Sequence, residues 1–301
     1  MKYMLFFVFT AVLWTSCEKE PDPFANDMFI IAGNNQNGFI NLALSESVQL
    51  LVHDQNGLPF PGKTVNIAVD EIGFGTISSG TSSGADIQVQ SDSTGSIFFV
   101  WTLGSSIGTQ SITVSAAEVS TTLQIQCRAY PWLQDSRDNK IYKTIEVGTQ
   151  NWMAENLSYQ SPGAVDYFKD SNTIIPTVYG KLYQWSEAIN VCPSGWHLPS
   201  DNEWTTLQQY IGGSNVGYEL KSSNNWLQGN GSNSYGMNVY PAGLMKPDSS
   251  FIGLGTQTWF WSATEFDADN ARLRKIFSSS DGVTQGYNDK AHGLSIRCVE
   301  D

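Results

Sequence analysis

Hydrophobic and polar positions alternate along much of residues 28–128, which is the pattern of β-strands that bury one face. The alternating apolar sets are Val48, Leu50 and Val52; Val65, Ile67 and Val69; Ile97, Phe99, Trp101 and Leu103; and Ile112, Val114 and Ala116. Turn-forming segments rich in Gly, Asn, Asp and Pro separate these runs at intervals near the roughly 8–12 residues typical of a β-sandwich. We find no helical periodicity here, so the pattern predicts an all-β domain.

The pattern changes in residues 129–301, where strict alternation gives way to long polar segments. Eight of the ten tryptophans lie in this region. Large rings fill irregular spaces between loops, so we expect a second domain that has few regular elements and depends on aromatic packing.

One helix in this second region has clear boundaries. Ser200 and Glu203 have the spacing of a capping box, in which each side chain bonds a free backbone amide of the first helical turn. Trp204, Leu207 and Ile211 then fall on one face, and glycines at 212–213 supply the end of the helix. The apolar spacing in residues 182–189 predicts a second, shorter helix, and residues 229–234 are expected to form a loop.

The N-terminal residues have the features of an export signal. Lys2 precedes an apolar run at residues 4–14, which is too short to span a membrane, and Cys17 follows. This arrangement resembles a lipoprotein signal peptide, which implies that residues 1–17 direct export and that Cys17 carries the lipid. The alternative is an ordinary secretory signal with a soluble product. The acidic, proline-containing stretch that follows predicts an extended tether over residues 18–27.

Charge narrows the choice of partners. The chain has 301 residues, with 29 acidic and 16 basic side chains and a formal net charge of -13. A field of this sign repels phosphate, so nucleic acid is not expected as a partner. Acidic residues directly behind a lipidated cysteine also resemble a signal for the outer face of the outer membrane. We therefore expect an outer membrane lipoprotein exposed at the cell surface.

The first region also carries a family resemblance in three segments. They are residues 52–59 (VHDQNGLP), 62–65 (GKTV) and 94–104, which ends in FVWTLG. Together they resemble a bacterial immunoglobulin-like domain of the invasin/intimin type. Such domains are spacers in surface proteins, so the resemblance implies a stalk over residues 28–128 rather than an active site.

The second region resembles another family in six segments that occur in order. They are residues 145–157 (IEVGTQNWMAENL), 179–185 (YGKLYQW), 192–204 (CPSGWHLPSDNEW), 240–244 (YPAGL), 260–265 (FWSATE) and 294–301 (LSIRCVED). They resemble the Fibrobacter succinogenes major paralogous domain, which is similar to the C-type lectin-like fold. The resemblance implies a mainly β chain in which an immunoglobulin-like sandwich precedes an α+β C-type lectin-like domain at residues 129–301.

The same resemblance implies a disulfide. In that fold a helical cysteine is bridged to one on the last strand, and Cys192 and Cys298 occupy those places. Three pairings are open to Cys127, Cys192 and Cys298. Export into an oxidising compartment favours a disulfide. A disulfide that closes a loop as long as that between Cys192 and Cys298 would stabilise the folded domain by roughly 4–5 kcal/mol in the chain-entropy model. We expect Cys127 to be a buried thiol.

Catalysis and metal binding are not expected from the residues available. The chain has three histidines and four cysteines, without an HExxH or CxxC pattern. Cys192 and His197 are close in sequence, but nothing marks a group that would orient the histidine as a base. Asp267, Asp269 and Asn270 form an oxygen-rich cluster, which we interpret as a solvated turn. We therefore predict a protein that is not an enzyme and needs no cofactor or metal.

Two functions from different classes fit these observations. The second domain is either an adhesin-like module for a protein or glycan ligand, or a structural component of the cell envelope or a surface fibre. For the first function we predict a contact surface in residues 265–292, to which Arg272, Arg274, Tyr287 and Asn288 contribute, because Tyr and Arg are favoured at interface hot spots. The alternative interpretation of that segment is an ordinary solvated hairpin.

Overall fold

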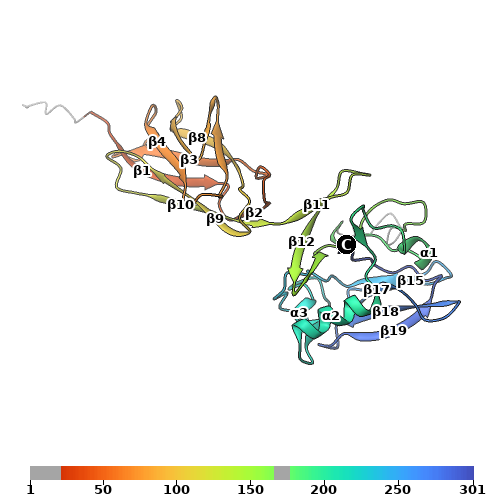
Figure 1. Ribbon diagram of the computed structural model, residues 1–301. Coiled ribbons are helices and arrows are strands. Elements are labelled where there is room, and N and C mark those ends of the chain that lie inside the picture. The colour runs from red at the N-terminus through yellow and green to blue at the C-terminus, as the bar shows by residue number, and fades with distance from the viewer. Residues whose placement is uncertain (1–21, 166–176) are drawn as a thin grey trace, which may run out of the picture.

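The computed structural model describes residues 22–165 and 177–301, which form two regions built mainly from strands (Figure 1). The expected signal peptide with Cys17, and residues 18–21 of the expected tether, lie outside the described residues. Strand β1 (Ala25–Ala32) begins inside the range expected for the tether. It pairs with β3 (Val48–Asp54), and Ala25 is buried, so the sandwich starts before residue 28.

Residues 25–130 form two five-stranded sheets packed face to face. The first has the order β1-β3-β8-β5-β6, with β8 (Ser96–Thr102), β5 (Thr76–Ser79) and β6 (Ser82–Gly84). The second has the order β2-β10-β9-β4-β7, formed by β2 (Gln36–Phe39), β10 (Leu123–Tyr130), β9 (Gly108–Ser115), β4 (Thr64–Val69) and β7 (Asp86–Gln90).

The alternation predicted from the sequence is confirmed in this sandwich. Val48, Leu50 and Val52 on β3 are buried, and so are Phe99 and Trp101 on β8. The two inner faces share one hydrophobic core, so this region is the expected immunoglobulin-like β-sandwich.

The chain passes directly from one region into the other. Strand β10 is followed across Pro131 by β11 (Trp132–Gln134). The indole Nε1 of Trp132 donates to the carbonyl of Ile40 at 2.8 Å, and the Ile40 amide donates to the Tyr130 carbonyl at 3.0 Å. The Lys143 ammonium lies 3.3 Å from the Tyr130 ring centroid, and burial, helped by the charge of Arg128, lowers the pKa of Lys143 to about 8. The junction is therefore bonded on both sides.

The second region contains two further sheets. One has the order β11-β12-β13-β20-β14, with β12 (Ile141–Val147), β13 (Gln150–Met153), β20 (Val299–Glu300) and β14 (Trp196–His197). The other has the order β16-β15-β17-β18-β19, with β16 (Phe251–Leu254), β15 (Ala242–Met245), β17 (Gln257–Glu265), β18 (Asn270–Phe277) and β19 (Thr284–Asp289). The first and last strands of the region share one sheet and the helices lie between them in the chain, so the domain has the arrangement expected of an α+β C-type lectin-like fold.

Helices occupy a small part of this domain. They are the 3-10 turn η1 (Thr177–Tyr179), α1 (Trp185–Ala188), α2 (Asp201–Ile211) and α3 (Val216–Leu220). The capping box of Ser200 and Glu203 is confirmed at the start of α2, and Gly212 follows its last residue with a positive φ. The helix predicted over residues 182–189 is shorter, and α3 has no counterpart in the sequence prediction. None of the helices within residues 22–165 and 177–301 is long and apolar enough to cross a membrane.

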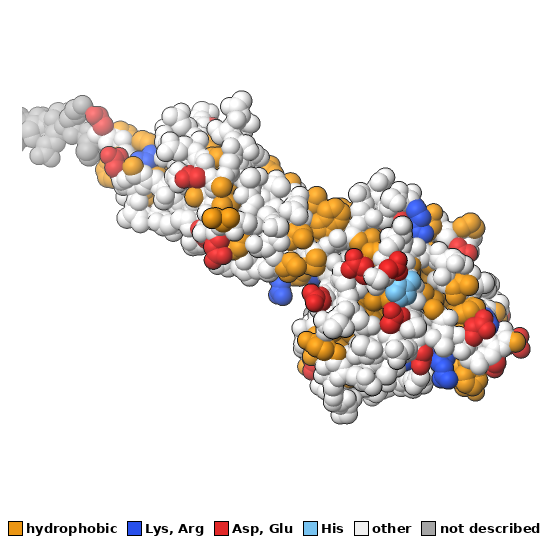
Figure 2. Space-filling model, viewed as in Figure 1, with side chains coloured by type: hydrophobic (Ala, Val, Ile, Leu, Met, Phe, Trp, Pro, Cys, Tyr) orange, Lys and Arg blue, Asp and Glu red, His pale blue; other side chains and the backbone are white. Residues whose placement is uncertain are grey.

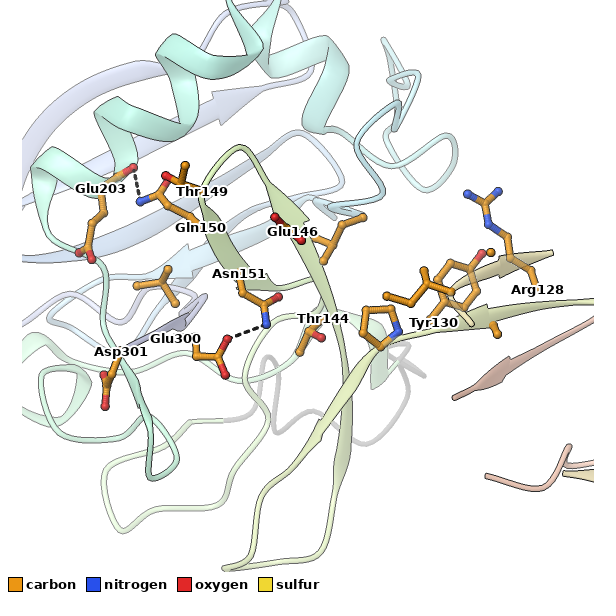
Figure 3. Close-up of a pocket in the computed structure, with 16 residues that line it drawn as sticks. Arg128, Tyr130, Thr144, Glu146, Thr149, Gln150, Asn151, Glu203, Glu300 and Asp301 are labelled. Carbon is orange, nitrogen blue, oxygen red and sulfur yellow. Dashed lines mark hydrogen bonds between the residues drawn. The ribbon is translucent and has the colours of Figure 1, made fainter. Parts of the chain in front are cut away.

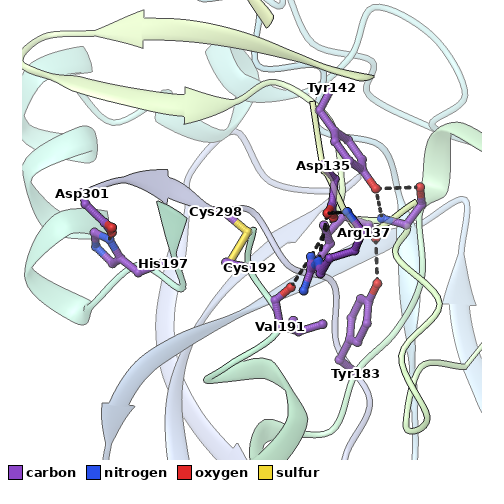
Figure 4. The surroundings of a disulfide bond; sticks show 11 residues. Asp135, Arg137, Tyr142, Tyr183, Val191, Cys192, His197, Cys298 and Asp301 are labelled. Carbon is purple, nitrogen blue, oxygen red and sulfur yellow. Dashed lines mark hydrogen bonds and ion pairs between the residues drawn. A yellow bond between two sulfur atoms is a disulfide. The ribbon is translucent and has the colours of Figure 1, made fainter. Parts of the chain in front are cut away.

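The predicted disulfide between Cys192 and Cys298 is confirmed (Figure 4). It joins the segment after α1 to the segment before β20 and lies against the core of the second domain. Cys127 lies on β10 as a free, buried thiol, and burial raises its pKa to about 11. The prediction of a buried, unpaired Cys127 is therefore confirmed.

A buried arginine organises the irregular part of the domain. Arg297 is completely buried, and its Nε donates to Asn156 at 2.7 Å. Its Nη atoms donate to the carbonyls of Met153, Met237 and Asn238. Burial lowers the pKa of Arg297 to about 9. Amide and carbonyl oxygens satisfy its donors, and no carboxylate of the described residues pairs with it. This side chain ties the loop before β15 to β13.

Candidate binding surface

An aromatic pair stands exposed at one end of the β18–β19 hairpin. Arg272 on β18 lies opposite Tyr287 on β19 in the antiparallel register. Phe266, in the turn between β17 and β18, stacks on Tyr287 with ring centroids 3.9 Å apart and planes inclined by 2°. The Arg272 guanidinium lies 5.2 Å from the Phe266 ring centroid. Phe266 is 43% and Tyr287 51% exposed, so the rings contact each other without entering the core.

The turn that carries Phe266 is fixed by its own hydrogen bonds. The Asp267 carboxylate accepts from the amides of Asp269 and Asn270 and from the Asn270 side chain. These bonds, with the Asn270 side chain first, hold the pKa of Asp267 below its usual value. The amide of Phe266 donates to the Asn270 carbonyl at 3.0 Å. The position of the Phe266 backbone is therefore set before any partner arrives.

Lys290 holds the same turn from the far side. Its ammonium donates to the carbonyls of Asp267 at 3.1 Å and Ala268 at 2.8 Å, and pairs with Glu265 at 3.3 Å. It also lies 4.6 Å from the Trp185 ring centroid. The Lys290 side chain is only 19% exposed, so its ammonium mainly contacts the turn and little of it faces solvent. The turn is thus attached to both α1 and the end of β19.

The structure brings together only part of the predicted contact set. Arg272 and Tyr287 lie side by side with Phe266, and Asn288 follows Tyr287 on β19 opposite Ala271. Phe266 was missed because it directly follows residues 260–265, which carry part of the family resemblance and lie on strand β17. The signal that could have found it is a lone aromatic residue followed by Asp-Ala-Asp-Asn, a run typical of a tight turn.

Arg274 is a correction to the predicted surface. It is 1% exposed and lies beneath α2. Its guanidinium donates to the Asp201 carboxylate, to Gln208 Oε1 at 2.7 Å and to Thr205 Oγ1 at 3.1 Å. A side chain with these bonds cannot meet a partner, so Arg274 anchors α2 to β18 instead of forming part of the contact surface.

The charges around the aromatic pair are mainly acidic. Glu265, Asp267, Asp269 and Asp289 are exposed, whereas Arg272 is half-buried and Lys290 is paired. The Asp267 carboxylate accepts hydrogen bonds from backbone and side-chain amides of its own turn. In the part of the chain that the structure describes, no group of three or more His, Cys, Asp or Glu side chains is placed to hold a metal ion.

A pocket of about 810 Å³ lies where the two domains meet (Figure 3). Arg128 and Tyr130 line it from the first domain. From the second domain it is lined by the β12–β13 hairpin and by the end of the chain, where Asn151 donates to Glu300 at 2.8 Å. The lining combines apolar side chains with four acidic ones, Glu146, Glu203, Glu300 and Asp301. Sequence reasoning could not find it, because its walls come from segments far apart in the chain.

Two short sequence patterns in the first domain also occur in enzymes. Residues 57–64 (GLPFPGKT) match the phosphate-binding pattern GxxxxGK[ST], and residues 80–84 (GTSSG) match GxSxG. The first leads into strand β4, whereas the phosphate loop needs a helix there. The second forms the turn and strand of the β5–β6 hairpin, with Ser79 paired to Ser82. Neither segment has the backbone that its pattern requires.

Comparison with solved structures gives matches to bacterial surface proteins. The chain is similar to the Yersinia pseudotuberculosis adhesin InvE, with 12% identity, a TM-score of 0.31 and coverage of 91% of this chain and 70% of that chain. It is similar to a C-terminal 282-residue fragment of intimin, crystallised with the intimin-binding domain of the translocated intimin receptor, with 11% identity, a TM-score of 0.28 and coverage of 92% and 100%.

A third match is domains 4 and 5 of the S-layer protein SbsC, with 16% identity, a TM-score of 0.28 and coverage of 36% of this chain. The match spans about half of that fragment, 53%. No curated protein matches the chain. The sequence model of the Fibrobacter succinogenes major domain matches residues 145–300, slightly more than half of the chain. The chain therefore belongs to the Fibrobacter succinogenes major domain family.

Proposed function

We propose that this protein is an exported, lipid-anchored surface protein whose second domain binds a ligand at the aromatic surface. We define this surface as Phe266, Arg272 and Tyr287 with the neighbouring Asn288. The immunoglobulin-like sandwich acts as the stalk that holds the domain away from the membrane. The proposed role is binding, of the kind an adhesin performs, without catalysis.

The observation that carries this proposal is the exposed Phe266–Tyr287 stack. Two large rings held in contact with water do not contribute to the core, and their turn is fixed by Asp267, Asn270 and Lys290. Rings that are already ordered lose little conformational entropy on binding, which favours affinity. Aromatic and arginine side chains in such positions are the ones that dominate binding energy at interfaces.

The test is to compare binding of the purified protein to arrayed glycans and extracellular proteins with that of Phe266→Ala/Tyr287→Ala. The double variant should lose at least about tenfold in affinity for whatever the parent binds, since each hot-spot ring contributes roughly 1 kcal/mol or more. Tyr218→Ala is the matched control, because Tyr218 is an exposed tyrosine on α3. Undiminished binding by the double variant would place the contact surface elsewhere.

The lipid anchor belongs to the same proposal and has its own test. If Cys17 carries the lipid, Cys17→Ala should release the protein from the membrane fraction, because stable anchoring takes two acyl chains or an equivalent second signal. Mass spectrometry of the mature N-terminus is the measurement. An unmodified N-terminus downstream of Cys17 would show that the anchor is absent while leaving the binding surface untouched.

A further inference from the structure

His197 lies between two carboxylates that come from distant parts of the domain. Its Nδ1 is 2.7 Å from Asp301 Oδ1, and its Nε2 is 2.9 Å from Glu203 Oε1. Glu203 belongs to the first turn of α2, and Asp301 directly follows β20. His197 itself lies on β14, where it pairs with Val299. Figure 2 shows acidic side chains around a histidine on this face of the second domain, and Figure 4 shows His197 beside Asp301.

This geometry can be complete in only one protonation state. A neutral imidazole has one N–H and one lone pair, so it can donate to one carboxylate while its lone pair faces the oxygen of the other. The imidazolium donates from both nitrogens and offsets one negative charge. We propose that His197 is a proton-controlled latch that holds Asp301 against α2 when the ring is doubly protonated.

The charged side chains around His197 are acidic, so the contact with Asp301 and Glu203 depends on the proton of the imidazolium. On α2, the second oxygen of Glu203 accepts from the backbone and hydroxyl of Ser200, so this carboxylate is held in the capping box. On β20, the Glu300 carboxylate accepts from Asn151 and does not contact the ring. Within the described residues, no Lys or Arg pairs with Glu203 or Asp301. Nothing else described there can replace the charge that His197 loses.

The consequence of opening is confined by the disulfide. Cys298 is bonded to Cys192, so the chain before Val299 stays in place. Glu203 keeps its Ser200 contacts, so α2 keeps its cap. Val299 is buried and paired with β13 and β14, and Glu300 accepts from Asn151, so β20 also stays in place. The freed part is therefore Asp301, which is otherwise held by its amide donating to the Gly195 carbonyl at 3.0 Å. Asp301 lines the pocket between the domains, so opening of the latch changes the position of one acidic side chain in the pocket wall.

The direction of the pH effect follows from the bonds. Burial alone would lower the pKa of His197, but the hydrogen bonds and charges of Asp301 and Glu203 outweigh it and raise the pKa above 6.5. The pKa of Glu203 is lowered, because its hydrogen bonds from the Ser200 amide, from His197 and from the Ser200 hydroxyl outweigh the effect of burial. A raised histidine pKa means that the latch is closed below about pH 6.5 and opens as the pH rises through the pKa of the folded state.

The experiment is an NMR titration of the purified, disulfide-bonded protein, following the His197 ring together with hydrogen exchange of the Asp301 amide. As the ring loses its proton, Asp301 exchange, corrected for the intrinsic effect of pH, should increase severalfold while the α2 amides remain protected. His197→Gln should show the fast exchange at every pH. His292→Gln is the matched control, since His292 is outside this contact, and it should titrate like the parent.

A second variant keeps the fold and tests the charge. Glu203→Gln retains a residue suited to the capping box but removes one negative charge, so the midpoint of the His197 titration should fall. The proposal is overturned if Asp301 exchange does not follow the state of the ring, if His197→Gln keeps the pH dependence of the parent, or if Glu203→Gln leaves the midpoint unchanged.

Discussion

Arg272 and Arg274 lie two residues apart on β18, yet only Arg272 can meet a partner. Both point to the same side of the strand, but α2 covers Arg274 and stops short of Arg272. Asp201 at the start of α2 joins Arg274 and also accepts from Gln285 on β19 at 2.7 Å. One carboxylate thus ties the helix to two strands, which makes the arginine beneath it structural.

We predict that Arg274→Met will lower the free energy of unfolding of the second domain by about 3 kcal/mol. Removing one partner of a largely buried ion pair leaves the other without compensation, which costs about 3–5 kcal/mol, and Asp201 remains 20% exposed. Arg272→Met should change the free energy of unfolding by less than about 1 kcal/mol. Denaturant unfolding followed by tryptophan fluorescence measures both, and equal effects would contradict the distinction drawn between them.

At the scale of elements, features that depend on neighbouring residues could be predicted from the sequence, whereas features that depend on packing between distant segments could not. The α2 cap followed from Ser200 and Glu203 because both partners lie within one turn. Strand β5 was missed because its serine-rich sequence resembles a turn, and its strand geometry comes from Ile77 pairing with Trp101 on β8. Strand β10 runs past the expected domain boundary at residue 128 to Tyr130, because Ala129 is buried in the core of the sandwich.

The same limit applies to the candidate site. Residues 265–292 could be selected from their polar composition and from the packed strands on either side. The face of β18 that α2 covers depends on how the helix docks, so Arg274 could not be separated from Arg272. The stacking of Phe266 on Tyr287 depends on a turn that folds back over the hairpin, and no periodicity in the sequence records that contact.

The α2 cap supports a prediction at this scale. Ser200→Ala should destabilise the second domain by about 1 kcal/mol, because the Glu203 amide loses its acceptor at the helix start. Ser223→Ala is the control, since Ser223 is exposed in the loop after α3 and should have little effect. Thermal unfolding of the two variants under the same conditions gives the comparison. Identical melting temperatures would mean that the cap does not limit the stability of α2.

For the molecule as a whole, the separate cores of the two domains predict separate unfolding transitions. The sandwich core is one cluster, and the second domain has its own clusters around the disulfide and α2. Cys192→Ala/Cys298→Ala should lower the melting temperature of the second domain, with a cost of up to roughly 4–5 kcal/mol in the chain-entropy model. Calorimetry should show the sandwich transition unchanged, and movement of both transitions together would indicate that the domains unfold as one unit.

The disulfide also determines how the molecule would respond to pulling. Under the proposed function, tension enters through the stalk and leaves through the aromatic surface near Tyr287. Without the bridge, unravelling from Cys192 towards Tyr287 would release the intervening chain. With it, force crosses from Cys192 to Cys298 and returns to Tyr287 through a short segment, so roughly eighty residues at about 3.5 Å each stay out of the load path. The part of the domain between Cys192 and the aromatic surface would then add little length under load, even after that part had opened.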